Sequence, residues 1–165
     1  MSDAPFRLAP LDAAHDRTAF RSDSEQLNRY LSEQVTQDIR RRVAACFVAV
    51  ADGQRIAGYY TLASASLLLA DLPVNTGKKL PRYPTVPAVR MGRLAVDQAF
   101  KGQGLGGALL ADALDRAASS EIAAFALLVD AKDAAAAAFY RHHGFIVLPD
   151  SPLTLFLPLA TVQRS

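Results

Sequence analysis

A glycine-rich segment in the second half of the chain has the composition of an anion-binding turn. A short apolar run precedes it, and Leu110, Ala113 and Leu114 begin a helical repeat after it. Glycine lets the backbone approach a ligand closely, and the first N–H groups of a helix are free to donate to phosphate oxygens. The sequence therefore predicts a phosphate or pyrophosphate site on this turn, which comprises Lys101, Gly102, Gln103, Gly104, Leu105, Gly106 and Gly107.

The same glycines also fit a dinucleotide-binding turn. Residues 102–107 satisfy the pattern G-x-G-x-x-G, and Asp130 ends a later apolar run, where such a fold would hold its ribose. In that fold the first strand runs almost directly into the first glycine, whereas here residues 97–101 intervene. About ninety residues precede the motif and about sixty follow, too few for a doubly wound sheet that starts at this turn. The context therefore disfavours a dinucleotide.

The positive charge of the chain is concentrated in its middle. Residues 40–93 contain nine basic and two acidic residues, although the net charge of the whole chain is only +2. This excess predicts a polyanionic partner, with nucleic acid as the first candidate, and a solvated basic face is the alternative.

Composition sets further bounds. The chain has 165 residues and is 51% hydrophobic, which predicts one domain with a sizeable core. Cys46 is the only cysteine and lies in an apolar run, so we expect a buried strand residue. The three histidines lack metal-ligand spacing, and we predict no metal site. The longest apolar runs are too short to span a bilayer and residues 1–10 have no apolar signal core, so we expect a cytoplasmic protein with no membrane partner.

The elements that must position the turn follow from periodicity. Residues 52–53 read Asp-Gly, a hairpin signal between two β-rich runs. Residues 71–87 contain four prolines and are predicted to form a loop. Strands are expected at 6–8, 44–51, 55–62, 94–96, 124–130, 145–148 and 153–157, and helices at 25–31, 33–41, after the glycine turn, and at 133–142.

Two segments resemble the cofactor motifs of the GNAT acyltransferases. Residues 101–106 are similar to the acetyl-CoA pyrophosphate loop Gln/Arg-x-x-Gly-x-Gly/Ala, with Lys101 at the first position. Residues 133–145 resemble the later segment Asn-x-x-Ala-x-x-x-Tyr-x-x-x-Gly-Phe, with Asp133 in place of Asn. The resemblance implies an α/β (α+β) fold, a mixed, mostly antiparallel central sheet with helices on both faces. It also implies acetyl-CoA as cofactor and one acetyltransferase domain over residues 1–165.

The resemblance also implies roles for single residues. The backbone of Leu94, Ala95 and Val96 would pair with the pantetheine arm, and the N–H of Leu94 or Val96 would hold the oxyanion. Tyr140 would be the general acid for the departing thiolate, and a core aromatic beside Phe139 is its plain alternative. Phe139 and Asp133 would belong to the cofactor site, although helix capping explains Asp133 equally well.

A second resemblance narrows the family to the GNAT toxins of toxin–antitoxin pairs. It is carried by Phe20, Glu25, Leu27, Asn28, Tyr30, Leu31, residues 58–62, Leu80, Pro81, Pro87 and residues 92–97. These toxins acetylate the amino group of aminoacyl-tRNA, which blocks translation. A ribbon-helix-helix antitoxin neutralises them, and they often form homodimers. If tRNA is the acceptor, its phosphates would be held by Arg40, Arg41, Arg42, Arg90 and Arg93, and Lys78, Lys79 and Arg82 would extend that surface.

Two other functions stay open on the sequence alone. One is acetylation of a small-molecule amine, a protein lysine or a protein N-terminus, and the other is acetyl-CoA binding without catalysis. No convincing general base is present, which favours an α-amine, because its reference pKa near 8 leaves more neutral amine than that of lysine near 10.4.

Overall fold

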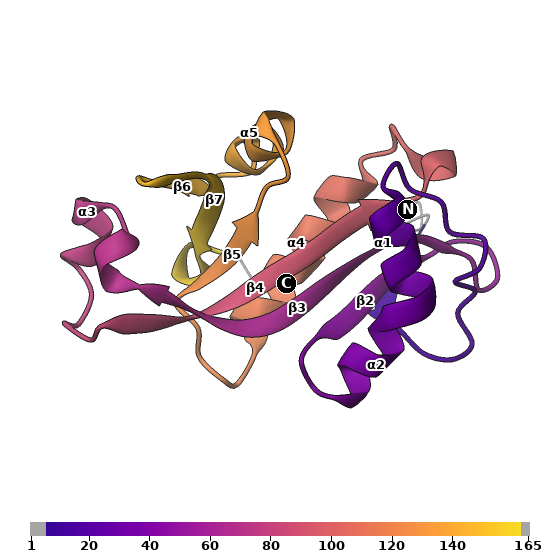
Figure 1. Ribbon diagram of the computed structural model, residues 1–165, viewed down its shortest axis with the longest axis horizontal. Coiled ribbons are helices and arrows are strands. Elements are labelled where there is room, and N and C mark those ends of the chain that lie inside the picture. Colours follow the sequence, from indigo (N-terminus) through magenta and orange to yellow (C-terminus); the bar gives the residue numbers. More distant parts are fainter. Residues whose placement is uncertain (1–5, 163–165) are drawn as a thin grey trace, which may run out of the picture. The chain divides into compact units, whose positions relative to one another are not determined.

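The computed structural model describes residues 6–162 and confirms the expected α/β class (Figure 1). A seven-stranded sheet has the order β1-β2-β3-β4-β5-β7-β6, in which β4 and β5 are parallel and the pairs β1-β2, β2-β3, β5-β7 and β6-β7 are antiparallel. The strands are β1 Arg7–Pro10, β2 Ala45–Val50, β3 Ile56–Leu68, β4 Thr85–Val96, β5 Ala126–Asp130, β6 Ile146–Leu148 and β7 Ser151–Pro158. The helices are α1 Glu25–Arg29, η1 Tyr30–Gln34, α2 Val35–Arg40, η2 Leu69–Asp71, α3 Val74–Gly77, η3 Gln98–Phe100, α4 Leu105–Ser119, α5 Ala134–His142 and η4 Leu159–Thr161.

The chain forms two compact units. The first contains the described residues up to Ala63 together with Gly92–Ala113, and the second contains Ser64–Met91 together with the described residues from Leu114. β3, β4 and α4 each continue from one unit into the other.

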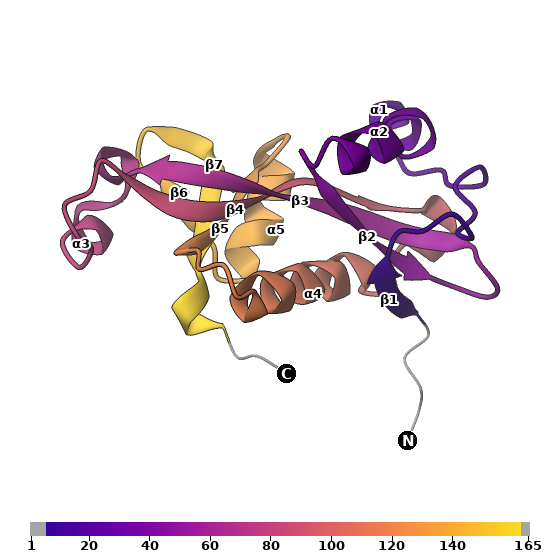
Figure 2. The same ribbon diagram turned by 90° about the horizontal axis from the view of Figure 1, so that it is seen from below.

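In the first unit, helices cover both faces of the sheet (Figure 2). Cys46, Val48 and Tyr59 share a buried cluster with the side chains of the helical run that starts at α1. The alternate residues of the same strands face the other way, where Gly58 lies beneath Leu109 of α4. The arrangement implied by the GNAT resemblance is therefore present in this unit.

The helical run from Glu25 to Arg40 is continuous rather than two separate helices. Ser24 caps its start by accepting from the N–H of Leu27 at 3.2 Å. Its middle turn, Tyr30–Gln34, is a π-helix, which no periodicity in the sequence signals. It ends beyond Arg40, where Arg42 takes a φ of 60° and donates its N–H to the carbonyl of Ile39.

The prediction that residues 71–87 form a loop is wrong in three places. η2 ends at Asp71 and α3 occupies Val74–Gly77, while β4 already begins at Thr85. The strand includes Pro87 near its start, and the carbonyl of Pro87 still accepts from the N–H of Phe125 at 2.8 Å. Proline at the beginning of a strand removes little from the hydrogen-bond ladder, so Pro87 does not prevent strand formation. β4 is therefore much longer than the strand expected at residues 94–96.

The second unit has its own apolar core. Its buried residues include Leu67 of β3, Val86 of β4, Leu128 of β5 and Phe156 of β7. α5 ends with the N–H of Phe145 donating to the carbonyl of Tyr140 at 3.1 Å, and Gly144 takes a φ of 93° in this closing turn. The turn fixes the end of the helix that carries Tyr140.

Replacing Gly58 by alanine is expected to destabilise the first unit. A Cβ at Gly58 would lie 2.8 Å from Leu109 Cδ1 and 3.0 Å from the carbonyl oxygen of Ala95. Such overpacking costs about 1–3 kcal/mol of the free energy of unfolding, measured by urea denaturation. Gly77→Ala is the control, because the nearest atom to its added Cβ lies at 3.8 Å; equal stability of the two variants would contradict the expectation.

Candidate active site

The last residues of β4 present backbone N–H groups in two directions. The N–H of Asp97 donates to the carbonyl of Ala57 on β3 at 2.8 Å. Because successive N–H groups of an extended strand alternate in direction, those of Leu94 and Val96 point away from β3. The family resemblance implies the N–H of Leu94 or Val96 for the oxyanion and the backbone of Leu94, Ala95 and Val96 for the pantetheine arm. By the same alternation the N–H of Ala95 points to β3, so only Leu94 and Val96 direct their N–H groups away from it.

A bulge in β4 precedes these groups. A Cβ on Gly92 would lie 3.5 Å from Thr61 Oγ1, and Thr61 pairs with Cys46 of the buried cluster that contains Tyr30. The guanidinium of Arg93 lies 3.6 Å from the centroid of the Tyr30 ring. Two consecutive residues therefore face the same side, which a regular strand does not allow.

Backbone directions along β4 agree with this bulge. The carbonyl of Pro87 points to β5, whereas the N–H of Asp97, ten positions later, points to β3. In a regular strand, residues an even number of positions apart direct their N–H and C=O groups to the same side. The opposite directions at Pro87 and Asp97 therefore require one extra residue between them. The bulge thus sets which way Leu94 and Val96 direct their N–H groups.

Asp97 holds the connection from β4 to the glycine turn. It is buried, and its carboxylate accepts from the N–H groups of Arg21 at 2.9 Å and Ala99 at 2.8 Å. Arg55 Nη2 lies 3.7 Å from the same carboxylate. No site role for Asp97 was predicted from the sequence, although a carboxylate directly after an apolar strand is a usable signal for a cap.

The glycine turn has the open backbone that an anion needs. Gly102 and Gly104 take φ values of 77° and 76°, and no atom lies within 4 Å of where their Cβ would be. The N–H of Ala108 donates to the carbonyl of Gly104 at 3.1 Å, so the N–H groups of residues 105–107 precede the first helical hydrogen bond. Leu105 is buried and fixes the start of α4. The turn therefore fits a pyrophosphate.

Lys101 has a partner within the protein. Its ammonium forms an ion pair with Asp23, which also accepts from Gln98 Nε2 at 3.0 Å. Both residues of the ion pair are about half-exposed, and Gln103 is exposed. Any interaction of Lys101 with a cofactor phosphate would therefore compete with Asp23.

Tyr140 combines a buried ring with an accessible hydroxyl. The ring lies 5.3 Å from that of Phe139 and 5.5 Å from that of Phe145, measured between centroids. Its hydroxyl has no hydrogen-bond partner within residues 6–162. Every fully buried side-chain nitrogen or oxygen atom in this range has a partner. The hydroxyl of Tyr140 is therefore not fully buried and reaches the surface. Burial, with a smaller contribution from Asp130, raises the pKa of Tyr140 to about 12.

The other two residues expected at the cofactor site lie on the same helix. Asp133 caps α5, because its carboxylate accepts from the N–H of Ala136 at 2.8 Å. Phe139 is half-buried, with its ring 4.8 Å from that of His143. The capping alternative for Asp133 is therefore realised.

Arg93 belongs to a cluster on the π-helical turn. The hydroxyl of Tyr30, beneath its guanidinium, donates to Asp38 at 2.8 Å, and Gln34 Nε2 donates to the same carboxylate at 3.2 Å. The hydrogen bond from Tyr30 lowers the pKa of Asp38 below its usual value, while burial raises the pKa of Tyr30. The cluster fixes a half-buried cation next to Leu94 in the chain.

The remaining arginines differ in their surroundings. Arg90 forms an ion pair with Asp130, and Asp130 also accepts from Thr154 at 3.1 Å. Arg40, Arg41 and Arg42 are exposed at the end of α2, which suits cations at a helix C-terminus.

The described part of the chain contains neither a metal site nor a membrane-spanning helix. Within residues 6–162, no group of three or more histidine, cysteine, aspartate or glutamate side chains could hold a metal ion. No helix in this range is long and apolar enough to span a membrane.

The fold and the backbone site together define an acyltransferase-like protein, and comparison identifies its family. The model of the acetyltransferase (GNAT) family matches residues 11–145. The chain belongs to this family and is an acetyltransferase, so the resemblance inferred from the two motifs is confirmed.

Two curated relatives are similar over nearly their whole length. The chain is 38% identical over 156 residues to the tRNA-acetylating toxin of Mycobacterium tuberculosis, a match covering 93% of this chain and 90% of the relative. It is 31% identical over 167 residues to the probable toxin TacT of Sinorhizobium fredii, covering 94% and 92%.

Solved structures of toxins share the fold. AtaT complexed with acetyl-methionyl-tRNAfMet matches with a TM-score of 0.89 and 30% identity, covering 95% of this chain and 96% of that one. AtaTR bound with acetyl-CoA matches with a TM-score of 0.82 and 29% identity, covering 96% of each chain. A mutant AtaT bound to the C-terminus of the antitoxin AtaR matches with a TM-score of 0.82 and 26% identity, covering 96% of each chain.

Proposed function

We propose that this acetyltransferase moves the acetyl group of acetyl-CoA to the α-amino group of aminoacyl-tRNA and thereby acts as a translation-blocking toxin. The observation that carries the proposal is the 38% identity, over 93% of the chain, to a relative named as a tRNA-acetylating toxin. The match to AtaT, solved with acetyl-methionyl-tRNAfMet, supports the same substrate class. Acetyl transfer from acetyl-CoA to charged tRNA tests the proposal directly.

The first unit supplies the groups that would hold acetyl-CoA. The N–H groups of residues 105–107 and the open backbone of the turn from Gly102 would hold its pyrophosphate, and the N–H groups of Leu94 and Val96 on β4 would bind its pantetheine arm. The bound cofactor contributes an activated thioester. The N–H of Leu94 or Val96, which points away from β3, would stabilise the charge that builds on the thioester oxygen.

Tyr140 is proposed to stabilise the leaving sulfur by donating a hydrogen bond to it. A phenol with a pKa of about 12 stays protonated at neutral pH and so remains a hydrogen-bond donor. Transfer of the whole proton to a thiolate of reference pKa about 8.5 is uphill, so Tyr140 acts mainly by donating a hydrogen bond as negative charge develops. The thiolate then takes up, through solvent, the proton that the attacking amine loses. Its unpaired, accessible hydroxyl suits this role.

The tRNA would be held by arginines. Arg40, Arg41 and Arg42 are exposed and form no ion pair within residues 6–162. Their guanidinium groups can therefore bind phosphates without losing an intramolecular partner. Arg90 and Arg93 are proposed to contribute as well, although each already has an intramolecular partner.

Arg93→Gln is expected to lower acetylation of charged tRNA about tenfold or more, because the variant cannot make a charge-assisted hydrogen bond to a phosphate. The affinity for acetyl-CoA, measured by isothermal titration calorimetry, should not change. Arg93→Lys keeps the charge but loses the planar stack on Tyr30, so it should retain more activity than Arg93→Gln but less than the wild type. Equal activity of Arg93→Gln and the wild type would remove Arg93 from the tRNA site.

Three further features complete the proposal. The chain acts as a single acetyltransferase domain over residues 1–165, which is supported by three elements that run through both compact units. It is neutralised in the cytoplasm by a ribbon-helix-helix antitoxin and works as a homodimer. The structure of AtaT with the antitoxin AtaR supports a protein partner of this kind.

A further inference from the structure

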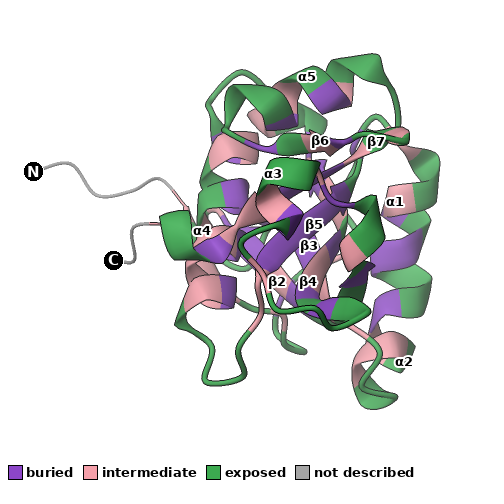
Figure 3. Ribbon diagram, turned by 90° about the vertical axis from the view of Figure 1, so that its left-hand side faces the viewer, coloured by how far each residue is buried: buried purple, intermediate pink, exposed green. Residues whose placement is uncertain are grey.

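The segment between β3 and β4, residues 69–84, is a folded platform in the second unit. The N–H of Leu69 donates to the carbonyl of Pro84 at 3.0 Å and closes the segment at its base. Leu72 is buried in the core of this unit, and Leu80 packs against the same core. Between them lies the short helix α3. The segment therefore holds a defined shape although much of its surface is exposed (Figure 3).

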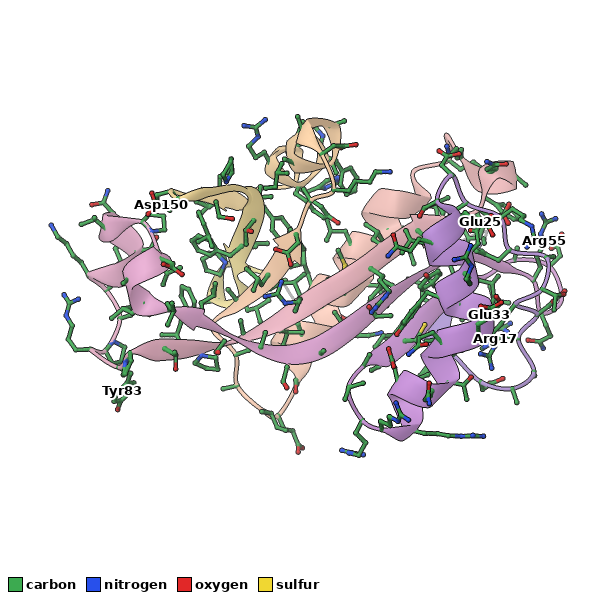
Figure 4. The ribbon with its side chains drawn as sticks, in the orientation of Figure 1. Arg17, Glu25, Glu33, Arg55, Tyr83 and Asp150 are labelled. Atoms are coloured by element: carbon green, nitrogen blue, oxygen red, sulfur yellow. The ribbon has the colours of Figure 1, made fainter. Side chains whose placement is uncertain are left out.

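Three cations and an aromatic ring are exposed on this segment. Lys78, Lys79 and Arg82 are exposed and form no ion pair within the described chain. Tyr83 is 66% exposed, and its side chain projects away from the ribbon (Figure 4). Asp71 is the only acidic residue of the segment.

This combination fits RNA better than a protein partner. Cations bind phosphates, and an exposed aromatic ring stacks on an unpaired base. Lysine is depleted in protein interfaces, which disfavours a second copy of the chain, even though Val74 on the same segment is 72% exposed. A tRNA offers both features at once, in the phosphates of its stems and in its unpaired bases.

We propose that Tyr83 stacks on an unpaired base of the tRNA while Lys78, Lys79 and Arg82 bind the neighbouring phosphates. The proposal rests on the proposed function and adds a binding surface to it. Tyr83 contributes a stacking surface that does not depend on base identity, so this platform raises affinity for tRNA without selecting the esterified amino acid.

The test compares binding of tRNA by four proteins in a filter assay at several salt concentrations. Tyr83→Ala should weaken the Kd about 5- to 100-fold, whereas Tyr83→Phe keeps the ring and should bind like the wild type. Lys78→Ala/Lys79→Ala should weaken binding and reduce the slope of log K against log salt by about 0.7–0.9 for each phosphate that the variant no longer binds. Acetyl-CoA affinity, measured in parallel, should stay unchanged in all variants.

The outcomes separate this inference from the proposed function. If the wild type binds no tRNA, the proposed function fails, and this surface fails with it. If the wild type binds and Tyr83→Ala binds equally well, only this surface is wrong. If Tyr83→Ala instead changes the sedimentation coefficient from dimer to monomer, the surface is a protein interface, and the proposal of RNA binding is overturned.

Discussion

Tyr140→Phe is expected to acetylate charged tRNA about ten- to thousandfold more slowly than the wild type, the usual range for a positioned acid. The substitution removes only the hydroxyl, which has no hydrogen-bond partner within residues 6–162. The ring contacts with Phe139 and Phe145 remain possible, so we expect the melting temperature to stay nearly the same. Single-turnover kinetics with saturating acetyl-CoA would measure the chemical step directly.

The pH dependence gives a second check on Tyr140. Its pKa is raised to about 12, so it stays protonated, and its titration should cause no loss of rate between about pH 6 and pH 10. The rate should instead rise with pH as the attacking amine, with a reference pKa near 8, loses its proton. Tyr140→Phe should keep this profile at a lower rate. A mutant rate equal to that of the wild type would exclude Tyr140 from the mechanism.

Gly104→Ala is expected to weaken acetyl-CoA binding about tenfold or more. An added Cβ would enter the open space above the backbone, where no protein atom lies within 4 Å and where the pyrophosphate is proposed to bind. It would displace a charge-assisted hydrogen bond of about 1.5–3 kcal/mol. Isothermal titration calorimetry with acetyl-CoA measures the change.

Gly53→Ala provides the matched control for Gly104→Ala. Gly53 has a φ of 66° against 76° for Gly104, and neither has an atom within 4 Å of its added Cβ. Both variants should therefore be destabilised to a similar extent, by about 1–2 kcal/mol, through backbone strain. Only Gly104→Ala should lose cofactor affinity, and an equal loss in both would show that the effect is a general one of stability.

The parts of the fold that depend on local sequence could be predicted. The glycine turn and the cap and end of α5 are encoded within a few residues, so Gly102, Gly104, Asp133 and Gly144 lie in the conformations that their types favour. The family resemblance added the order of the motifs along the chain, which composition alone does not supply.

The parts that depend on distant contacts could not be predicted. The prolines of residues 71–87 suggested a loop, yet the pairing of β4 with β5 tolerates Pro87 and extends the strand. The bulge at Gly92 and Arg93 appears only when the neighbours of both residues are known. The stack of Arg93 on Tyr30 joins residues 63 positions apart in a cluster that no motif indicates.

Transfer of labelled acetyl from acetyl-CoA to a pool of charged tRNA tests the central claim most directly. Uncharged tRNA, a panel of free amines and a protein substrate serve as controls, and Tyr140→Phe is assayed beside the wild type. We expect label on charged tRNA alone, released with the amino acid by mild base and strongly reduced in the mutant. Label only on free amines or protein would rule out aminoacyl-tRNA as the substrate, because the chain would then be an acetyltransferase with a different acceptor.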